Sequence, residues 1–427
     1  MKTYEYKEYQ ETYHEFLLHN RLPVHIIHKP NFAKTYVTLS TPLGANHRHY
    51  IEQDNTVQTV PSGIAHFLEH KIFEQDGFDI SGEFSKTEAS INAYTEYTRT
   101  TYLFHSTNHL IENTCRLINM FFFPNFTDKG IVNEKNIILE ELNMHLDDPY
   151  YIQYQQIINN MYHNHPVKED ILGSPTSIQA IDYHALVAMH KAYYQPELSR
   201  LIIIGDVDPV QLKTDLESRV KLPSISLLKP YNVAYQETLD VVKANETMAL
   251  DVLKPSVLIG IKLKPLTHLE PLKRINEQLS FSLLFDLMLG KNSDFYEHMM
   301  DSELINDSYG LDLTFESDYA FALISSETNQ PDALNAALIT LLKSIQDFTI
   351  NIDDFNRLKR QMIGSFMQSL DSLEYVSHQM NRYLQDGLML YDVVTMAQKI
   401  TYEDVLKQRH QWIQFNQIST LIVNPKK

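Results

Sequence analysis

Two histidines and a glutamate within five residues, His66-Phe67-Leu68-Glu69-His70, have the types and the spacing that a metal centre needs. Residues four apart lie on one face of a helix, so His66 and His70 would direct two imidazoles at one point, as zinc requires. Glu69 would lie beside them, where its carboxylate could reach a water on the metal without filling a ligand position. A lone histidine such as His66 is more simply interpreted as a core residue, so the interpretation depends on a third ligand.

The best candidate for a third ligand is Glu141, which lies in a segment with a helical pattern. Seven residues make nearly two turns of helix, so Glu134 and Glu141 share one face, whereas Glu140 points about 100° away. A catalytic zinc site uses three protein ligands and an open position. Glu141 can therefore ligate while Glu134 hydrogen-bonds to a ligand histidine and orients it. The alternative is that Glu134 and Glu140 pair with Lys135 and with solvent, as surface glutamates commonly do.

The composition is that of a globular protein with two to three domains, because 43% of the 427 residues are hydrophobic and 11% are aromatic. The net charge of −18 argues against a nucleic-acid partner, which would require a basic surface. No apolar run is long enough for a membrane span, and the polar N-terminal segment does not resemble a signal peptide. With Cys115 as the only cysteine, no disulfide can form within the chain. We therefore expect a cytoplasmic protein without membrane or nucleic-acid partners.

The chain contains an internal repeat. Three residues of the first half recur in the second half at a constant offset, since 400 − 181, 402 − 183 and 414 − 195 are all 219. Ile181, Tyr183 and Gln195 recur as Ile400, Tyr402 and Gln414. Strands near the start of each half, 36–43 and 257–263, are expected to correspond. The repeat predicts a domain 1–220 with the metal site, a proline-containing linker 221–230, and a homologous domain 231–427 without a metal motif.

Hydrophobic periodicity predicts a mixture of short strands and helices in the first half. The predicted strands are 23–29, 35–41, 89–95, 101–105 and 201–205. The predicted helices are 61–75, 109–121, 131–147, 150–162 and 178–192. Strands with hairpin-like neighbours favour an α+β fold of two tandem homologous domains, each a mainly antiparallel sheet packed against helices.

With both segments in place, the chain resembles the insulinase/pitrilysin family of zinc metallopeptidases, the inverzincins, in which H-x-x-E-H is followed some seventy residues later by E-x(6)-E. Here Glu141 follows His70 by 71 residues and Glu134 by seven. Further matches are Ser62-Gly63-Ile64-Ala65, Asn92-Ala93-Tyr94-Thr95, Pro124-Asn125-Phe126, Asp147-Asp148-Pro149, Ile171-Leu172-Gly173 and Gly205-Asp206. The resemblance covers essentially the whole chain.

The resemblance implies the insulinase-like fold and a zinc-dependent endopeptidase that cleaves peptides or small unfolded polypeptides. It assigns roles to six residues and one bound Zn²⁺ per chain: zinc ligands His66, His70 and Glu141, general base Glu69, and edge-strand substrate contacts Asn92 and Ala93. Glu134 would support a ligand histidine, as the helical spacing also suggests.

The second half departs from the family pattern. Family members usually carry an Arg, and a Tyr seven residues later, that bind substrate and stabilise the tetrahedral oxyanion. Met300 and Asp307 occupy these positions here, and neither can donate a hydrogen bond to an oxyanion at neutral pH. Tyr309 is two residues out of register. The family's two-gene bacterial branch pairs a zinc-bearing subunit with a paralogue that lacks the motif but keeps the Arg and Tyr. By resemblance to its zinc-bearing subunit, we expect a heterodimer.

Two other functions stay open from the sequence. One is a non-catalytic assembly or processing subunit that keeps its zinc for structure. Glu69 argues against it, since a structural zinc needs no general base and would more often fill its fourth position. The other is a maturation peptidase with one dedicated substrate, which the sequence does not separate from general peptide turnover.

Overall fold

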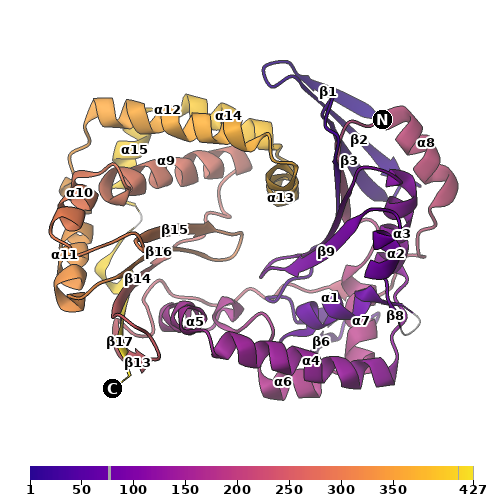
Figure 1. Cartoon of the computed structure of the whole chain (residues 1–427), viewed down its shortest axis with the longest axis horizontal. Helices are drawn as coiled ribbons and strands as arrows, with labels where there is room; N and C mark the ends of the chain where they lie inside the picture. Colours follow the sequence, from indigo (N-terminus) through magenta and orange to yellow (C-terminus); the bar gives the residue numbers. More distant parts are fainter. Residues whose placement is uncertain (76–77, 412, 427) are drawn as a thin grey trace. The chain divides into compact units, whose positions relative to one another are not determined.

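The structure, a computed structural model, describes residues 1–75, 78–411 and 413–426, and it divides into two compact units (Figure 1). Unit 1 comprises Met1–Asn143, Glu169–Ala234 and Leu370–Gln385. Unit 2 comprises Met144–Lys168, Tyr235–Ser369 and Asp386–Lys427. Each half of the sequence therefore contributes one segment to the unit that is built mainly from the other half.

Unit 1 is built on a seven-stranded sheet of order β1-β2-β3-β11-β4-β10-β9. Its strands are β1 (Lys2–Tyr6), β2 (Glu11–Leu18), β3 (Leu22–His28), β4 (Thr35–Thr41), β9 (Ser90–Thr95), β10 (Thr100–Ser106) and β11 (Arg200–Gly205). β3 and β11 run parallel, and the other neighbours run antiparallel. Two small sheets join β12 (Lys229–Pro230), β5 (His49–Ile51) and β6 (Val57–Thr59), and β7 (Glu74–Gln75) with β8 (Phe78–Asp79).

Eight helices accompany the sheets of unit 1 in the described residues. They are α1 (Ile64–Phe73), α2 (Ser81–Ser85), α3 (Leu110–Phe122), α4 (Asp128–Leu146), α6 (Pro175–Ala180), α7 (Tyr183–Tyr193), α8 (Pro209–Arg219) and α13 (Leu373–Tyr383). α4 ends inside the residues assigned to unit 2. No helix among the described residues is long and apolar enough to cross a membrane.

The alternation of side chains along β4 shows how the sheet is covered on both faces. Val37 and Leu39 belong to the hydrophobic core that also contains buried residues of α1 and α3. Thr38 and Ser40 point to the opposite face, where the Thr38 hydroxyl lies 2.8 Å from that of Ser377 in α13. The Ser40 hydroxyl donates to Asn381 Oδ1 of the same helix at 2.7 Å. A polar stripe on β4 thus holds α13 against the sheet.

Unit 2 repeats the core of this arrangement with a five-stranded sheet of order β13-β17-β14-β16-β15. Its strands are β13 (Asn245–Leu250), β14 (Ser256–Leu263), β15 (Gly310–Phe315), β16 (Ala320–Glu327) and β17 (Ile418–Pro425). Its helices are α5 (Pro149–Met161), α9 (Pro271–Leu289), α10 (Asp294–Asp301), α11 (Pro331–Lys343), α12 (Ile352–Ser369), α14 (Leu390–Lys399) and α15 (Tyr402–Gln408). Short 3₁₀ turns are η1 (Pro166–Lys168), η2 (Ile345–Asp347), η3 (Leu384–Asp386) and η4 (Phe415–Gln417).

The strand orders confirm the predicted duplication and α+β fold. The order β3-β11-β4-β10-β9 of unit 1 corresponds to β13-β17-β14-β16-β15 of unit 2, with one parallel pair at the same place. β4 and β14 are equivalent, as predicted from 36–43 and 257–263. α5 covers β14 as α13 covers β4, since Ser256 donates to Gln153 at 2.7 Å.

Three of the predicted helix boundaries were wrong. The helix predicted at 131–147 is α4, which begins three residues earlier, at Asp128. The helix predicted at 178–192 is two helices, α6 and α7, because the chain is extended at Ile181 and Asp182, whose carboxylate accepts the Ala185 N–H at 2.8 Å and caps α7. The helix predicted at 61–75 is α1, which begins three residues later, because Gly63 has a left-handed backbone. β1 and β2 were not predicted.

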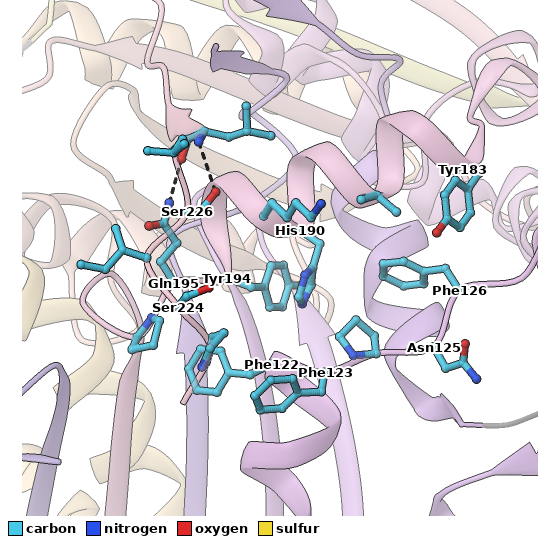
Figure 2. A pocket seen from close by; sticks show the side chains of 18 of the residues that line it. Phe122, Phe123, Asn125, Phe126, Tyr183, His190, Tyr194, Gln195, Ser224 and Ser226 are labelled. Atoms are coloured by element: carbon cyan, nitrogen blue, oxygen red, sulfur yellow. Dashed lines mark hydrogen bonds between the residues drawn. The ribbon is translucent and has the colours of Figure 1, made fainter. Parts of the chain in front are cut away.

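A buried histidine makes the stability of unit 1 depend on pH. Burial lowers the pKa of His190 from 6.5 to about 4, and a ring nitrogen of this residue lies 2.9 Å from the Phe121 carbonyl. Figure 2 shows His190 and Tyr194 at one wall of a pocket of about 840 Å³ that contains none of the candidate zinc residues. The folded state therefore holds this imidazole neutral.

We expect acid to destabilise the fold through this histidine. The unfolded chain takes up a proton near pH 6.5 and the folded chain only near pH 4, so this contribution is present above pH 6.5 and is lost as the pH falls towards 4. The loss should be about 2.5 kcal/mol at pH 4.5. Urea unfolding of the wild type and His190→Gln at pH 7 and pH 4.5 measures it, with exposed His109→Gln as the control. An unchanged pH dependence in His190→Gln would contradict the assignment.

Candidate metal centre

The histidine helix α1 is fixed at its N-terminus by a close backbone contact. Gly63 precedes the helix with φ +86°, a conformation that L side chains rarely adopt. A Cβ on Gly63 would also lie 2.2 Å from the Leu172 carbonyl oxygen. The matches Ser62-Gly63 and Ile171-Leu172-Gly173 are therefore two loops in backbone contact, which set where α1 begins and how His66 and His70 are presented.

The structure brings His66 and His70 of α1 together with Glu141 of α4. Their ligand atoms all lie within 4.8 Å of one another. Nε2 of His66 is 3.7 Å from Glu141 Oε1, and Nε2 of His70 is 3.5 Å from Glu141 Oε2. Donor atoms on a tetrahedral zinc with bonds of about 2.0–2.1 Å lie about 3.3 Å apart. A His, His, Glu donor set at this spacing fits zinc.

Glu134 contacts one of the three candidate ligands, His70, and is not itself one of them. Its Oε1 is 2.9 Å from Nδ1 of His70, so the second nitrogen of that ring is the one near Glu141. Glu134 is 9% exposed, and Lys135 donates to the Gln179 carbonyl at 2.7 Å. The alternative that Glu134 simply pairs with Lys135 is therefore wrong.

Gly130 of α4 lies against a charged pair at the C-terminal end of α1. Gly130, one turn before Glu134, lies over a fully buried Lys71 that pairs with Glu74. A Cβ on Gly130 would come within 2.6 Å of both charged groups. A larger side chain at this position would displace the ends of the Lys71 and Glu74 side chains. Glu140 is exposed, as its helical position predicts.

Glu69 is held by a residue to which the sequence analysis gave no role. Thr95, at the end of β9, donates its hydroxyl hydrogen to Glu69 Oε2 at 2.6 Å. Burial raises the pKa of Glu69, and the hydrogen bond from Thr95 opposes part of that rise. The signal for Thr95 was present in Asn92-Ala93-Tyr94-Thr95, but no spacing rule relates it to Glu69.

The carboxylates around His70 raise its pKa by more than burial lowers it. Burial alone would lower the pKa of His70, but the hydrogen bond and charge of Glu134, with the charges of Glu69 and Glu141, raise it. The carboxylates around His70 therefore favour a positive charge at this ring. The same excess of negative charge would favour a divalent cation there.

The predicted substrate contacts lie on an edge strand. β9 ends the sheet and pairs, within the described residues, with β10 alone. The Glu96 N–H donates to the Arg99 carbonyl at 2.8 Å and closes this hairpin, so the alternating pattern turns the N–H and C=O of Ala93 towards the free edge. The Ala93 N–H is bonded to Asn92 Oδ1 at 2.9 Å. The Asn92 side chain therefore covers an edge donor.

Met300 and Asp307, at the positions of the family's Arg and Tyr, lie in unit 2 at the end of α10 and in the turn that follows. Met300 packs, half-buried, on the hydrophobic core of unit 2 at the end of α10. Asp307 is exposed in the turn that follows. Tyr309 is 6% exposed, and its hydroxyl donates to the Leu289 carbonyl at 2.8 Å. The Tyr309 hydroxyl hydrogen is therefore engaged in a hydrogen bond within unit 2.

Replacing Glu134 by glutamine should weaken zinc binding without removing a ligand. The neutral amide no longer holds His70 in one tautomer or increases its basicity, which typically costs 10- to 100-fold in metal affinity. Competition with a chromogenic chelator measures the change, and exposed Glu140→Gln on the same helix is the control. Equal affinities for both variants would show that the 2.9 Å contact has no influence on the metal.

Comparison with known proteins gives matches along most of the chain. The family model described as Insulinase (Peptidase family M16) matches residues 49–175, and the model described as Peptidase M16 inactive domain matches residues 180–362. The first of these ranges contains every candidate zinc residue, Glu69 and β9.

Related proteins and solved structures agree with these matches. The chain is 34% identical to the uncharacterized zinc protease YmfH of Bacillus subtilis over 100% of both chains. It is 22% identical to the zinc protease PqqE of Helicobacter pylori over 85% of this chain and 84% of that one. The crystal structure of an M16-like protein from Alicyclobacillus acidocaldarius has a TM-score of 0.91 and 25% identity, with 97% and 99% of the two chains covered. A protease structure from Helicobacter pylori shares the fold, with a TM-score of 0.80 and 20% identity.

Proposed function

The chain belongs to the insulinase family of peptidases, family M16, and from this premise we propose that it is a zinc-dependent endopeptidase acting on peptides or small unfolded polypeptides. The observation that carries the proposal is the meeting of His66, His70 and Glu141 beside a carboxylate, Glu69, that lies outside the ligand set. His66, His70 and Glu141 would hold one Zn²⁺. When bound, the ion would polarise the peptide carbonyl and make a water more acidic.

Glu69 is the proposed general base. Its Oε2 accepts from Thr95, which leaves the other carboxylate oxygen to receive a proton from the attacking water. The raised pKa of Glu69 suits the next step, because a carboxyl group that holds its proton more tightly can deliver it to the leaving amine. Thr95 positions the carboxylate through both transfers.

The free edge of β9 is the proposed substrate-binding strand. An extended peptide would pair with the outward N–H and C=O of Ala93, and the Asn92 side chain would move from the Ala93 N–H to the peptide. Main-chain pairing of this kind depends on an extended conformation more than on sequence. It would place the peptide next to Thr95 and hence next to Glu69.

We further propose that a second chain completes the active site. The negative charge that develops on the carbonyl oxygen needs hydrogen-bond donors, and loss of one donor typically costs about 10²- to 10³-fold in kcat. Met300 and Asp307 offer none at neutral pH, and Tyr309 is bonded to Leu289. A paralogue that lacks the zinc motif but carries the Arg and Tyr pair would supply them in a heterodimer.

A library of quenched peptides tests the function. We expect slow chelator-sensitive cleavage by the isolated chain and an increase of at least about 10²-fold when the paralogue is added. Strong cleavage by the isolated chain would refute the need for a partner. Zinc binding without cleavage under any pairing would favour the alternative of a non-catalytic assembly subunit. Cleavage restricted to one substrate would favour a dedicated maturation peptidase. The cytoplasmic location stays a prediction, tested by cell fractionation.

A further inference from the structure

A polar cavity of about 300 Å³ in unit 1 lies next to the edge strand β9. It is lined by β4, β9 and the first half of α13, and its wall holds three tyrosines, two serines, a threonine and a histidine around one carboxylate, Glu374. Tyr94 of β9 and Tyr36 of β4 line it from the sheet. The zinc candidates and Glu69 are not part of its wall.

The cavity and the zinc candidates lie against opposite faces of β9. Ile91 and Ala93 pack on the core that includes α1, and Thr95 bonds to Glu69 of α1. Side chains alternate between the faces of a strand, so Tyr94, which lies between Ala93 and Thr95, points to the other face and lines the cavity. A peptide paired with β9 would also alternate, and its side chain nearest Tyr94 would point to this cavity.

One carboxylate at the cavity, Glu374, is exposed and has no ion-pair partner among the described residues. Glu96 pairs with Arg99 at 3.0 Å and with His378, from α13, at 3.2 Å. Glu374 lies one turn before His378 on the same helix, and it forms no ion pair with any residue that the structure describes. Burial is the main cause of the raised pKa of Tyr36 and Tyr94, and the negative charge of Glu374 adds to it in both. Glu374, Tyr36 and Tyr94 therefore line one cavity and interact electrostatically.

We propose that this cavity binds a lysine or arginine side chain of the substrate, with Glu374 as the counter-charge and the Tyr36 and Tyr94 hydroxyls as further acceptors. The inference rests on the proposed function, because it takes the free edge of β9 as the peptide-binding strand. Tyr94 adjoins Thr95, which bonds to Glu69. The substrate residue whose side chain enters the cavity therefore lies within about two residues of the cleaved bond. The strongly acidic chain, with a net charge of −18, would also attract basic peptides.

The test is a set of quenched peptides with Lys, Arg, Gln or Glu placed in turn at each position of a neutral sequence. With the paralogue present if cleavage needs it, kcat/KM should be about tenfold higher for Lys and Arg than for Gln at one position near the cleaved bond. Glu374→Gln should remove that preference, and Glu374→Lys should turn it towards Glu. Asp371→Asn is the matched control, since it removes one exposed charge just before α13, outside the cavity wall, and it should keep the preference.

Binding of the same peptides to Glu69→Gln, followed by fluorescence anisotropy, gives a readout that needs no turnover. Cleavage without a basic preference, or a preference that survives in Glu374→Gln, would overturn this inference and leave the peptidase function intact. Peptides that are neither cleaved nor bound under any pairing would overturn the proposed function, and the inference with it.

Discussion

Glu69→Gln should reduce kcat for peptide cleavage by about 10²- to 10⁴-fold, the usual contribution of a general base, while the zinc content stays at one per chain. The amide has nearly the shape of the carboxylate and can still accept the Thr95 hydroxyl at the position of Oε2. It cannot take up a proton. Glu69 is also outside the set of ligand atoms formed by His66, His70 and Glu141, so the metal should be retained.

Metal analysis and kinetics on the same preparation measure this prediction. Thr95→Val is the companion variant with a smaller expected effect, because it keeps the carboxylate but removes the hydrogen-bond donor that Glu69 has among the described residues. Thr95→Ser should restore activity. Loss of zinc in Glu69→Gln would instead make Glu69 a ligand. Activity within about twofold of the wild type would exclude it as the base.

The sequence could predict the residues of the candidate metal centre because they follow rules of local geometry. His66 and His70 share a turn of α1, and Glu134 and Glu141 share a face of α4, so helical periodicity fixes each pair. What brings the two helices together is not local. It involves contacts between the two helices, such as that of Gly130 with the Lys71 and Glu74 pair, and no periodicity indicates them.

For the fold, too, the sequence pattern could predict some features, whereas those that depend on contacts between distant segments could not be predicted. The constant offset between the halves predicted the duplication, and the equivalent strand orders confirm it. The repeat could not show that α5 and α13 each belong to the unit opposite their own half of the sequence. That exchange depends on contacts of far-separated residues, such as Ser40 with Asn381. Thr95 was missed for the same reason, since its partner Glu69 lies on another element.

The largest expected effect on metal binding comes from the third ligand. Glu141→Gln should weaken zinc binding by more than about 100-fold, beyond the range expected for Glu134→Gln, because it replaces a charged ligand instead of an orienting group. The site would keep two imidazoles, whose Nε2 atoms now lie 3.7 and 3.5 Å from Glu141 oxygens. Peptide cleavage should fall with the metal content.

Glu140→Gln is the matched control, since it removes the same charge from the adjacent, exposed residue of α4. Zinc that binds only the folded chain raises the melting temperature as its concentration rises above the dissociation constant, so thermal unfolding with and without zinc gives a readout that needs no activity. The zinc-dependent rise should persist in Glu140→Gln and vanish in Glu141→Gln. If both variants keep it, Glu141 is not a ligand, and the two histidines must find their third partner in another residue or another chain.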